Sequence, residues 1–221
     1  MKCKVIWVNF CPVFYFQFNH QHDLCFTFLR LQEFYESPCG KHRTKTFSID
    51  EYIDWHLKKF GLFNYLDKWT GFNIPGVTVA NFFRLFQFQL TRREKKIFNT
   101  LKKYKSWPNI YIGKQDYCVI AGCNHDSVTL QHELKHAAFY LDNEYAKEVQ
   151  KEITQNKPKV LVNWLKASGY DQSSIVDEIN AYTLTGWPED CRVTKKMKQL
   201  KRALRKVDKK YGYSEQKNYS F

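Results

Sequence analysis

Two histidines and a glutamate in the middle of the chain have the types and spacing of a metal-dependent hydrolase. They occur in the run His132-Glu133-Leu134-Lys135-His136, an HExxH sequence. Residues four apart share one face of a helix, so the two imidazoles can hold one metal ion while Glu133 reaches a water bound to it. The spacing therefore predicts a hydrolytic metal centre. The alternative is a pair of structural histidines on an amphipathic helix.

The residues around the motif favour the helix that it needs. The run Ser127–Leu141 contains neither Pro nor Gly, and Leu130, Leu134 and Ala137 recur at helical spacing. We predict one helix that carries the motif and extends from about Asp126 or Ser127 to Ile153.

A catalytic zinc usually takes three protein ligands and leaves a fourth position for water. The chain contains no histidine after His136, so a downstream carboxylate must complete the site. Glu178 is the best placed, because it lies in a predicted helix that begins after Ser174. The intervening segment is long enough to bring this helix back beside the first.

These residues resemble a known group of enzymes. His132-Glu133-x-x-His136, followed on a later helix by Glu178-x-x-Ala181, looks like the gluzincin branch of the zinc metallopeptidases, the thermolysin-like zincins. The resemblance covers roughly residues 127 to 183. It implies that the two histidines and Glu178 bind Zn2+ and that Glu133 is the general base.

One position departs from the pattern of that family. Thermolysin-like enzymes carry an Asp four residues after the Glu ligand to orient a histidine, and here that position is Tyr182. Gluzincins often use a Tyr or His to stabilise the tetrahedral intermediate, which makes Tyr182 a candidate catalytic residue. Asp177 or Asp142 could hydrogen-bond a ligand imidazole and fix its tautomer.

The implied chemistry is hydrolysis of a peptide bond. Zinc lowers the pKa of its bound water to about 7, and Glu133 takes the proton as the water attacks the carbonyl. Glu133 then passes the proton to the leaving amine. Because the ligands do not encode the scissile bond, a non-peptidase zinc hydrolase is an alternative.

The composition indicates a globular protein of a reducing compartment. With 221 residues, of which 43% are hydrophobic, the chain can bury a hydrophobic core without disulfide bonds or a structural metal ion. Its seven cysteines are scattered and form no CxxC pair, which argues against a disulfide framework and a thiolate zinc site. We expect a cytoplasmic protein without a signal peptide or a membrane span. Abundant Phe, Tyr, Lys and Asn are compatible with a viral or phage origin.

The formal net charge of +13 is concentrated in two stretches. Residues 92–105 carry seven basic residues against Glu94, and residues 192–210 carry ten against Asp208. The second stretch has its apolar residues on one helical face, so Val193–Tyr211 predicts a basic amphipathic helix. A second hypothesis follows: a nucleic-acid-binding or virion-type interaction protein that uses basic helices, with a vestigial or structural metal site. A solvated outer face would explain the same pattern.

Strand and loop signals concentrate in the first half of the chain. Residues 4–18 predict two strands or a hairpin, and Leu24–Phe34 could be a strand or a short helix. Turn residues and bulky rings at Asp67–Gly76 predict a loop that lines a cleft or plugs the core. Two short β-like runs, Asn109–Gly113 and Tyr117–Ile120, form either a hairpin or an open sheet edge to which a peptide could add.

Helix signals are clearest at the capping boxes. Ser48 begins a predicted helix that extends to about Phe60, and Thr91 begins another that extends to about Lys105. Pro158 and Gly169 frame a short helix over Lys159–Ala167.

These elements predict an α+β fold in one zincin-like domain, residues 1–221. A strand-rich N-terminal lobe, residues 1–108, would carry a small mixed or antiparallel sheet. It would pack on a mainly helical half, residues 109–221, that carries the HExxH helix, with the cleft between them.

Overall fold

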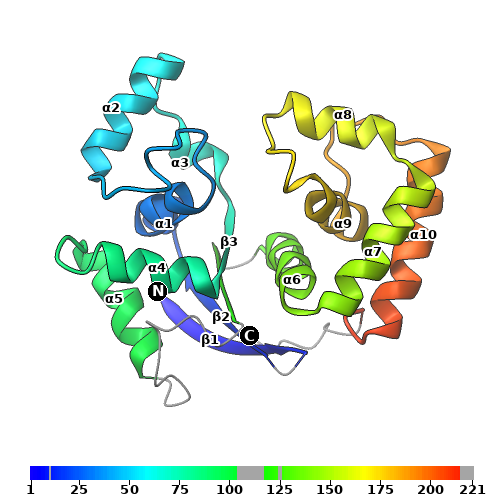
Figure 1. Cartoon of the computed structure of the whole chain (residues 1–221), viewed down its shortest axis with the longest axis horizontal. Helices are drawn as coiled ribbons and strands as arrows, with labels where there is room; N and C mark the ends of the chain where they lie inside the picture. Colours follow the sequence, from blue (N-terminus) through cyan, green and yellow to red (C-terminus); the bar gives the residue numbers. More distant parts are fainter. Residues whose placement is uncertain (10, 104–116, 124–125, 215–221) are drawn as a thin grey trace. The chain divides into compact units, whose positions relative to one another are not determined.

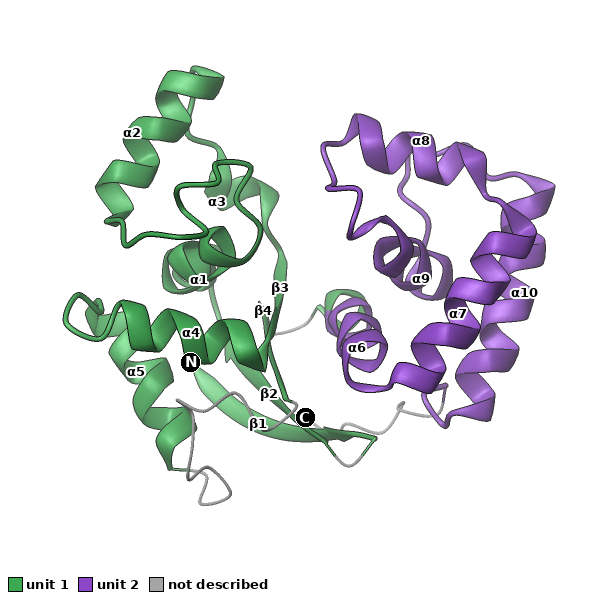
Figure 2. Cartoon of the chain, viewed as in Figure 1, with its two compact units in different colours: residues 1–129 green, residues 130–221 purple. Residues whose placement is uncertain are grey.

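The computed structural model describes the chain except residues 10, 104–116, 124–125 and 215–221, and its fold is α+β, as predicted. The chain divides into two compact units, residues 1–129 and 130–221, which Figure 2 colours separately. All strands of the described residues lie in the first unit, together with five helices, and the second unit is helical (Figure 1). The sequence-based boundary after residue 108 falls among residues that are not described.

The first unit contains a four-stranded mixed sheet. Antiparallel strands β1 and β2 form the hairpin that the alternating residues predict. Strand β4 runs parallel to β2, with Phe14 opposite Val119, and β3 runs antiparallel to β4, which gives the order β1-β2-β4-β3. The strands are β1 (Lys2–Val8), β2 (Cys11–Phe18), β3 (Gly71–Pro75) and β4 (Cys118–Cys123).

The prediction that an open sheet edge precedes the HExxH helix is wrong. Residues 118–120 of the predicted run Tyr117–Ile120 belong to β4, which pairs with β2 on one side and with β3 on the other. An extended peptide therefore has no free edge of β4 to join. The partner run in the alternative hairpin, Asn109–Gly113, lies outside the described residues.

The ambiguous segment Leu24–Phe34 is helical and belongs to α1, which contacts the sheet through β2, β3 and β4. Nearly every residue from Leu24 to Glu33 is buried, so the helix has no exposed polar face. The sequence therefore lacks the alternation of apolar and polar residues that would identify a helix. The helices of this unit are α1 (Gln21–Glu36), α2 (Ile49–Phe60), α3 (Tyr65–Lys68), α4 (Gly76–Leu85) and α5 (Arg92–Lys102).

The segment Asp67–Gly76, predicted as a loop, instead contributes strand β3 to the sheet. Its Phe72 is buried and stacks on Phe28 of α1 with ring centroids 5.5 Å apart, so the alternative of an aromatic plug on the core describes this side chain correctly. Strand β3 pairs only with β4 among the described strands, and an edge strand tolerates Pro75 because its outer N–H positions need no ladder partner.

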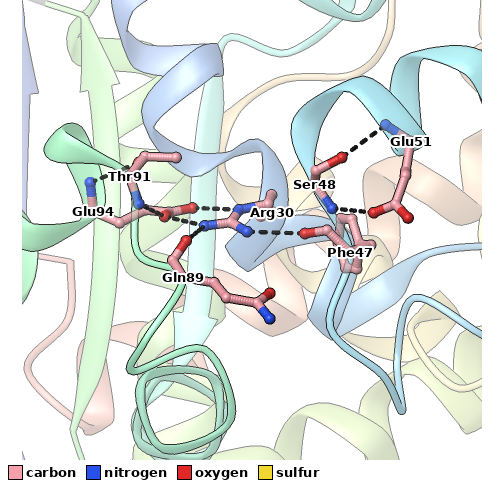
Figure 3. Close-up of polar contacts among 7 residues, drawn as sticks. All are labelled: Arg30, Phe47, Ser48, Glu51, Gln89, Thr91 and Glu94. Atoms are coloured by element: carbon pink, nitrogen blue, oxygen red, sulfur yellow. Dashed lines mark hydrogen bonds and ion pairs between the residues drawn. The ribbon is translucent and has the colours of Figure 1, made fainter.

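Both predicted capping boxes are present. Ser48 Oγ accepts from Glu51 N and Thr91 Oγ1 from Glu94 N, and each Glu carboxylate accepts from the backbone N–H of its cap residue. Figure 3 shows how the two boxes differ: the Glu94 carboxylate also pairs with the buried guanidinium of Arg30.

The Arg30 guanidinium joins three segments that are far apart in the sequence. Its Nε donates to Glu94 Oε1 at 2.9 Å, and its terminal nitrogens donate to the carbonyls of Phe47 at 2.8 Å and Gln89 at 2.9 Å (Figure 3). The Arg30 and Glu94 side chains are almost fully buried, so each charge depends on the other.

Glu94→Ala is expected to lower the free energy of unfolding by about 3–5 kcal/mol, because it leaves a buried guanidinium without its carboxylate. Urea denaturation measures the change. Glu51→Ala removes the same carboxylate from the exposed capping box and is the matched control, with a much smaller expected loss. Equal losses from the two substitutions would contradict a stabilising role for the Arg30 pair.

The second unit consists of helices, and the predicted single helix from residue 127 to 153 is wrong. The chain breaks at Asp142, whose Oδ1 accepts from the backbone N–H groups of Glu144 and Tyr145 and so begins a new helix. The helices are α6 (Ser127–Leu141), α7 (Asn143–Asn156), α8 (Lys159–Ala167), α9 (Ile175–Thr185) and α10 (Lys195–Lys210). Among the described residues, no helix is long and apolar enough to cross a membrane.

Candidate metal centre

Helix α6 places the two histidines of the motif one turn apart. The rings of His132 and His136 meet edge to face with their centroids 4.8 Å apart. Leu134, Ala137 and Ala138, which lie between and after them, are buried in the core. The helix begins at Ser127, and Asp126 just before it accepts a hydrogen bond on Oδ1 from Thr129 N at 2.8 Å. The two residues of this hydrogen bond are three apart in the sequence, so the start of the helix depends on local sequence alone.

A buried ion pair fixes the orientation of α6. Lys135, inside the motif, donates from Nζ to both carboxylate oxygens of Asp208 on α10, at 2.7 and 2.8 Å, and to the carbonyl of Tyr213 at 3.0 Å. Tyr145 on α7 also hydrogen-bonds Asp208 through its hydroxyl, at 3.3 Å. These contacts fix the side of α6 that carries Lys135. Because the helix is rigid, they also fix the direction in which His132 and His136 point.

Glu178 on α9 faces both imidazoles. Its Oε2 lies 3.8 Å from His132 Nε2, and its Oε1 lies 3.8 Å from His136 Nε2. One donor atom from each of the three residues lies within 4.8 Å of the others. The structure therefore brings together the three ligands that the sequence predicts, and this group could hold a metal ion.

The other ring nitrogen of His136 is held by a carboxylate. His136 Nδ1 lies 2.8 Å from Asp177 Oδ2. Of the two aspartates that the sequence left open for this task, the geometry selects Asp177. Asp142 instead caps α7 and accepts from the Tyr213 hydroxyl at 2.8 Å.

Thr185 performs the same task for His132. The Thr185 hydroxyl donates its single hydrogen to the Ala181 carbonyl at 2.7 Å, so toward His132 Nδ1, at 3.2 Å, it can only accept. His132 must then carry its hydrogen on Nδ1, which leaves a lone pair on Nε2 toward Glu178. Sequence reasoning missed Thr185; its only signal was its spacing of seven from Glu178, which places both on one face of α9.

The charges around the group suit a cation. Burial raises the pKa of Glu178, but the His136 and His132 imidazoles outweigh it and lower that pKa. Burial lowers the pKa of His136, but the carboxylates of Asp177 and Glu178 outweigh it and raise that pKa well above its usual value. Glu178 Oε2 is buried and has no hydrogen-bond partner among the described residues. A buried carboxylate oxygen in this position is what a metal ligand would present, so the residues fit a metal ion.

Glu133 lies between the histidines in sequence and beside them in space. It is buried, and its charge interacts with His136, His132 and Glu178. Burial raises the pKa of Glu133 to about 7, against the opposing effect of the two imidazoles. The His132 and Glu178 side chains beside it keep 18% and 15% of their exposure, so this group lies near the protein surface although Glu178 Oε2 itself is buried.

One tyrosine lies against His132, and a second tyrosine contacts the first. The Tyr182 ring meets the His132 ring with centroids 4.7 Å apart, and its hydroxyl hydrogen-bonds the Tyr170 hydroxyl at 2.9 Å. Burial raises the pKa of both phenols, and the carboxylate of Glu178 adds to the effect, so both remain hydrogen-bond donors near neutral pH. Sequence reasoning missed Tyr170, which lies in the connection between α8 and α9 and follows no motif.

Thr185→Val is expected to weaken metal binding by about 10–100-fold, the usual loss when the partner of a ligand imidazole is removed. Competition with a chromophoric chelator measures the affinity. Thr183→Val is the matched control, because Thr183 lies on the same helix, is buried, and its hydroxyl has no hydrogen-bond partner within the described part of the chain. Thr185→Ser keeps the hydroxyl and should restore most of the affinity. Equal affinities for Thr185→Val and Thr183→Val would remove Thr185 from the site.

The fold and the site define an α+β protein with a His-His-Glu group that could hold a metal ion and with a buried glutamate beside it. Comparison with protein-family models, curated proteins and solved structures finds no significant match.

Proposed function

We propose that the protein is a zinc-dependent metallopeptidase that hydrolyses peptide bonds. The observation that carries the proposal is the position of Glu133 beside three metal-ligand candidates whose donor atoms lie within 4.8 Å of one another. A structural metal site needs no such carboxylate, because its ligands already satisfy the metal. The resemblance of the motif to the gluzincins supports the same function.

The donor set supports zinc as the metal. Two imidazoles and one carboxylate, with the coordination incomplete, are the ligands of catalytic zinc in proteases of this kind, and a zinc ion would displace the proton that the neighbouring carboxylates favour on His136. The partners of the imidazoles support the assignment, because Asp177 and Thr185 hold the Nδ1 atoms and direct both Nε2 atoms toward Glu178. When bound, a zinc ion supplies Lewis acidity: it lowers the pKa of a coordinated water to about 7 and polarises the scissile carbonyl.

Glu133 performs the proton transfers in this proposal. Its carboxylate accepts a proton from the attacking water and later delivers it to the amine that leaves. Its burial supports the role, because burial raises the pKa of this carboxyl to about 7, close to the pKa of a zinc-bound water, and a general base works best when its pKa lies near the operating pH.

The hydrogen-bonded pair of tyrosine hydroxyls supplies one proposed donor to the oxyanion. Tyr182 is the residue that the family resemblance suggested, and its contact with the His132 ring supports this role. The hydrogen bond between Tyr170 and Tyr182 uses one hydroxyl hydrogen and leaves the other available to the developing negative charge.

The proposed setting is the cytoplasm. All seven cysteines are free thiols, which is usual for proteins in a reducing compartment.

The test combines metal analysis with substrate hydrolysis. Purified protein is expected to contain one zinc per chain and to cleave denatured proteins, with new amino termini detected by mass spectrometry. A chelator should stop cleavage and added zinc should restore it. A parallel panel of non-peptide amides and esters separates a peptidase from another zinc hydrolase. A protein that binds no zinc, or that binds zinc and cleaves only the non-peptide substrates, would contradict the proposal.

A further inference from the structure

Helix α10, the orange to red helix in Figure 1, buries its apolar side in its own unit. Met197, Leu200 and Leu204 are fully buried, and the helix packs on α7 and α9. Packing on the core therefore explains the apolar face of this amphipathic helix. It does not explain the charged face.

The opposite side of α10 presents only positive charge. The acidic residue of the helix, Asp208, is buried against Lys135 and does not reach this surface. Glu148 of α7 is an acidic partner from a neighbouring helix, and it engages Lys210 at the C-terminal end. Six exposed cations share this side of the helix, and we call them the basic row: Lys195, Lys198, Arg202, Arg205, Lys206 and Lys209.

The arrangement of the basic row works against the stability of the helix. Like charges three or four residues apart repel, as Lys198 and Arg202 or Arg202 and Lys206 must do. Lys195 and Lys196 occupy the first turn, where the positive end of the helix dipole disfavours cations, and no acidic residue is there to offset them. Burial lowers the pKa of the neighbouring Lys201, and the charge of Arg205 lowers it further. A surface selected only for solubility would be expected to mix signs.

The chemistry of the basic row distinguishes between polyanions. An anionic membrane would take apolar side chains into its interface, and those of α10 at Met197, Leu200 and Leu204 are buried in the protein. A nucleic acid presents a dense line of phosphates that needs only cations, and Arg202 and Arg205 can bind phosphate oxygens bidentately. The six cations of the row extend along about 21 Å of the helix, at about 1.5 Å per residue from Lys195 to Lys209, and can follow such a line.

We propose that the outer face of α10 is a docking surface for the phosphate backbone of a nucleic acid. The surface reads no base sequence, because its contacts are charges on long side chains. It is independent of the metal centre: the basic row uses none of the residues assigned to metal binding or proton transfer.

Fluorescence anisotropy with short labelled oligonucleotides, single-stranded and duplex, tests the proposal on the whole chain. The logarithm of the binding constant should fall linearly with the logarithm of salt concentration between about 50 and about 200 mM. The triple variant Lys198→Gln, Arg202→Gln, Arg205→Gln should bind at least about tenfold more weakly and lose about three units of the salt slope, roughly one per lost contact.

The matched control is the triple variant Lys147→Gln, Lys159→Gln, Lys166→Gln, which removes three exposed cations from α7 and α8. It should bind the oligonucleotides nearly as wild type does, and circular dichroism should show both variants folded. Polyglutamate and anionic vesicles are the competing probes, and each should bind at least about tenfold more weakly than an oligonucleotide. Equal losses in the two triple variants, absence of salt-dependent binding, or tighter binding of polyglutamate or vesicles would each overturn the assignment.

Discussion

Glu133→Gln is expected to abolish peptide hydrolysis while the protein still binds one metal ion per chain. Glutamine keeps the size and the hydrogen-bonding shape of the side chain, but it cannot accept the proton of the attacking water. General-base catalysis contributes about 10²–10⁴-fold to a rate, so kcat should fall at least about 100-fold. The loss should appear in kcat rather than in KM, because the carboxylate acts on the water and not on the substrate.

The control must separate lost chemistry from lost structure. Glu144→Gln removes an exposed carboxylate from α7, where it pairs with Lys147, and should leave turnover unchanged. Metal content by elemental analysis and the thermal midpoint should be the same in wild type and both variants. Turnover retained by Glu133→Gln would remove the general base from the proposed mechanism, even with zinc in place.

The ligands of the candidate site could be predicted because their signal is local. His132 and His136 are one turn apart, and a continuous helical pattern around them fixes their common face. Glu178 was found by elimination, since no later histidine exists and its helix begins at a recognisable turn. That helix does begin after Ser174, although the Ser174 hydroxyl donates to the Asp171 carbonyl and does not cap it.

The partners of the ligands could not be chosen in the same way. Asp177 and Asp142 were equal candidates in sequence, and the difference between them is that Asp142 interrupts a helical pattern and uses its carboxylate on the next helix. Thr185 was invisible because a single hydroxyl on a helix is usually bonded to its own backbone, as this one also is. Its second role depends on where α9 lies beside α6, which no local pattern records.

The sheet shows the same limit at a larger scale. Alternation and the connecting turn sufficed for the β1–β2 hairpin, because those strands are neighbours in sequence. Strand β4 pairs with β2 across about a hundred residues, and β3 was hidden in a segment dense in turn residues. Since period and turn signals say nothing about distant partners, the edge or interior position of β4 could not be inferred. The buried ion pairs, Arg30 with Glu94 and Lys135 with Asp208, likewise join residues that no spacing connects.

Glu178→Ala is expected to remove the metal. The substitution deletes the carboxylate that faces both Nε2 atoms and leaves two imidazoles, which hold zinc poorly. Since removing the partner of a ligand already costs about 10–100-fold in affinity, removing a ligand should cost more than about 100-fold. After dialysis, the wild type should retain one zinc per chain and the variant almost none.

Thermal unfolding gives a second readout that needs no substrate. A metal that binds only the folded chain stabilises it, so a chelator should lower the midpoint of the wild type and leave that of Glu178→Ala unchanged. Glu189→Ala removes an exposed carboxylate beyond the end of α9 and should behave as the wild type does. Zinc retained by Glu178→Ala at wild-type affinity would remove Glu178 from the ligand set. Asp177, whose Oδ2 lies 2.8 Å from His136 Nδ1, would then be the next carboxylate to test as a ligand. Asp177→Ala should lower the metal affinity by about 10–100-fold if Asp177 only orients His136, and by more if it binds the metal.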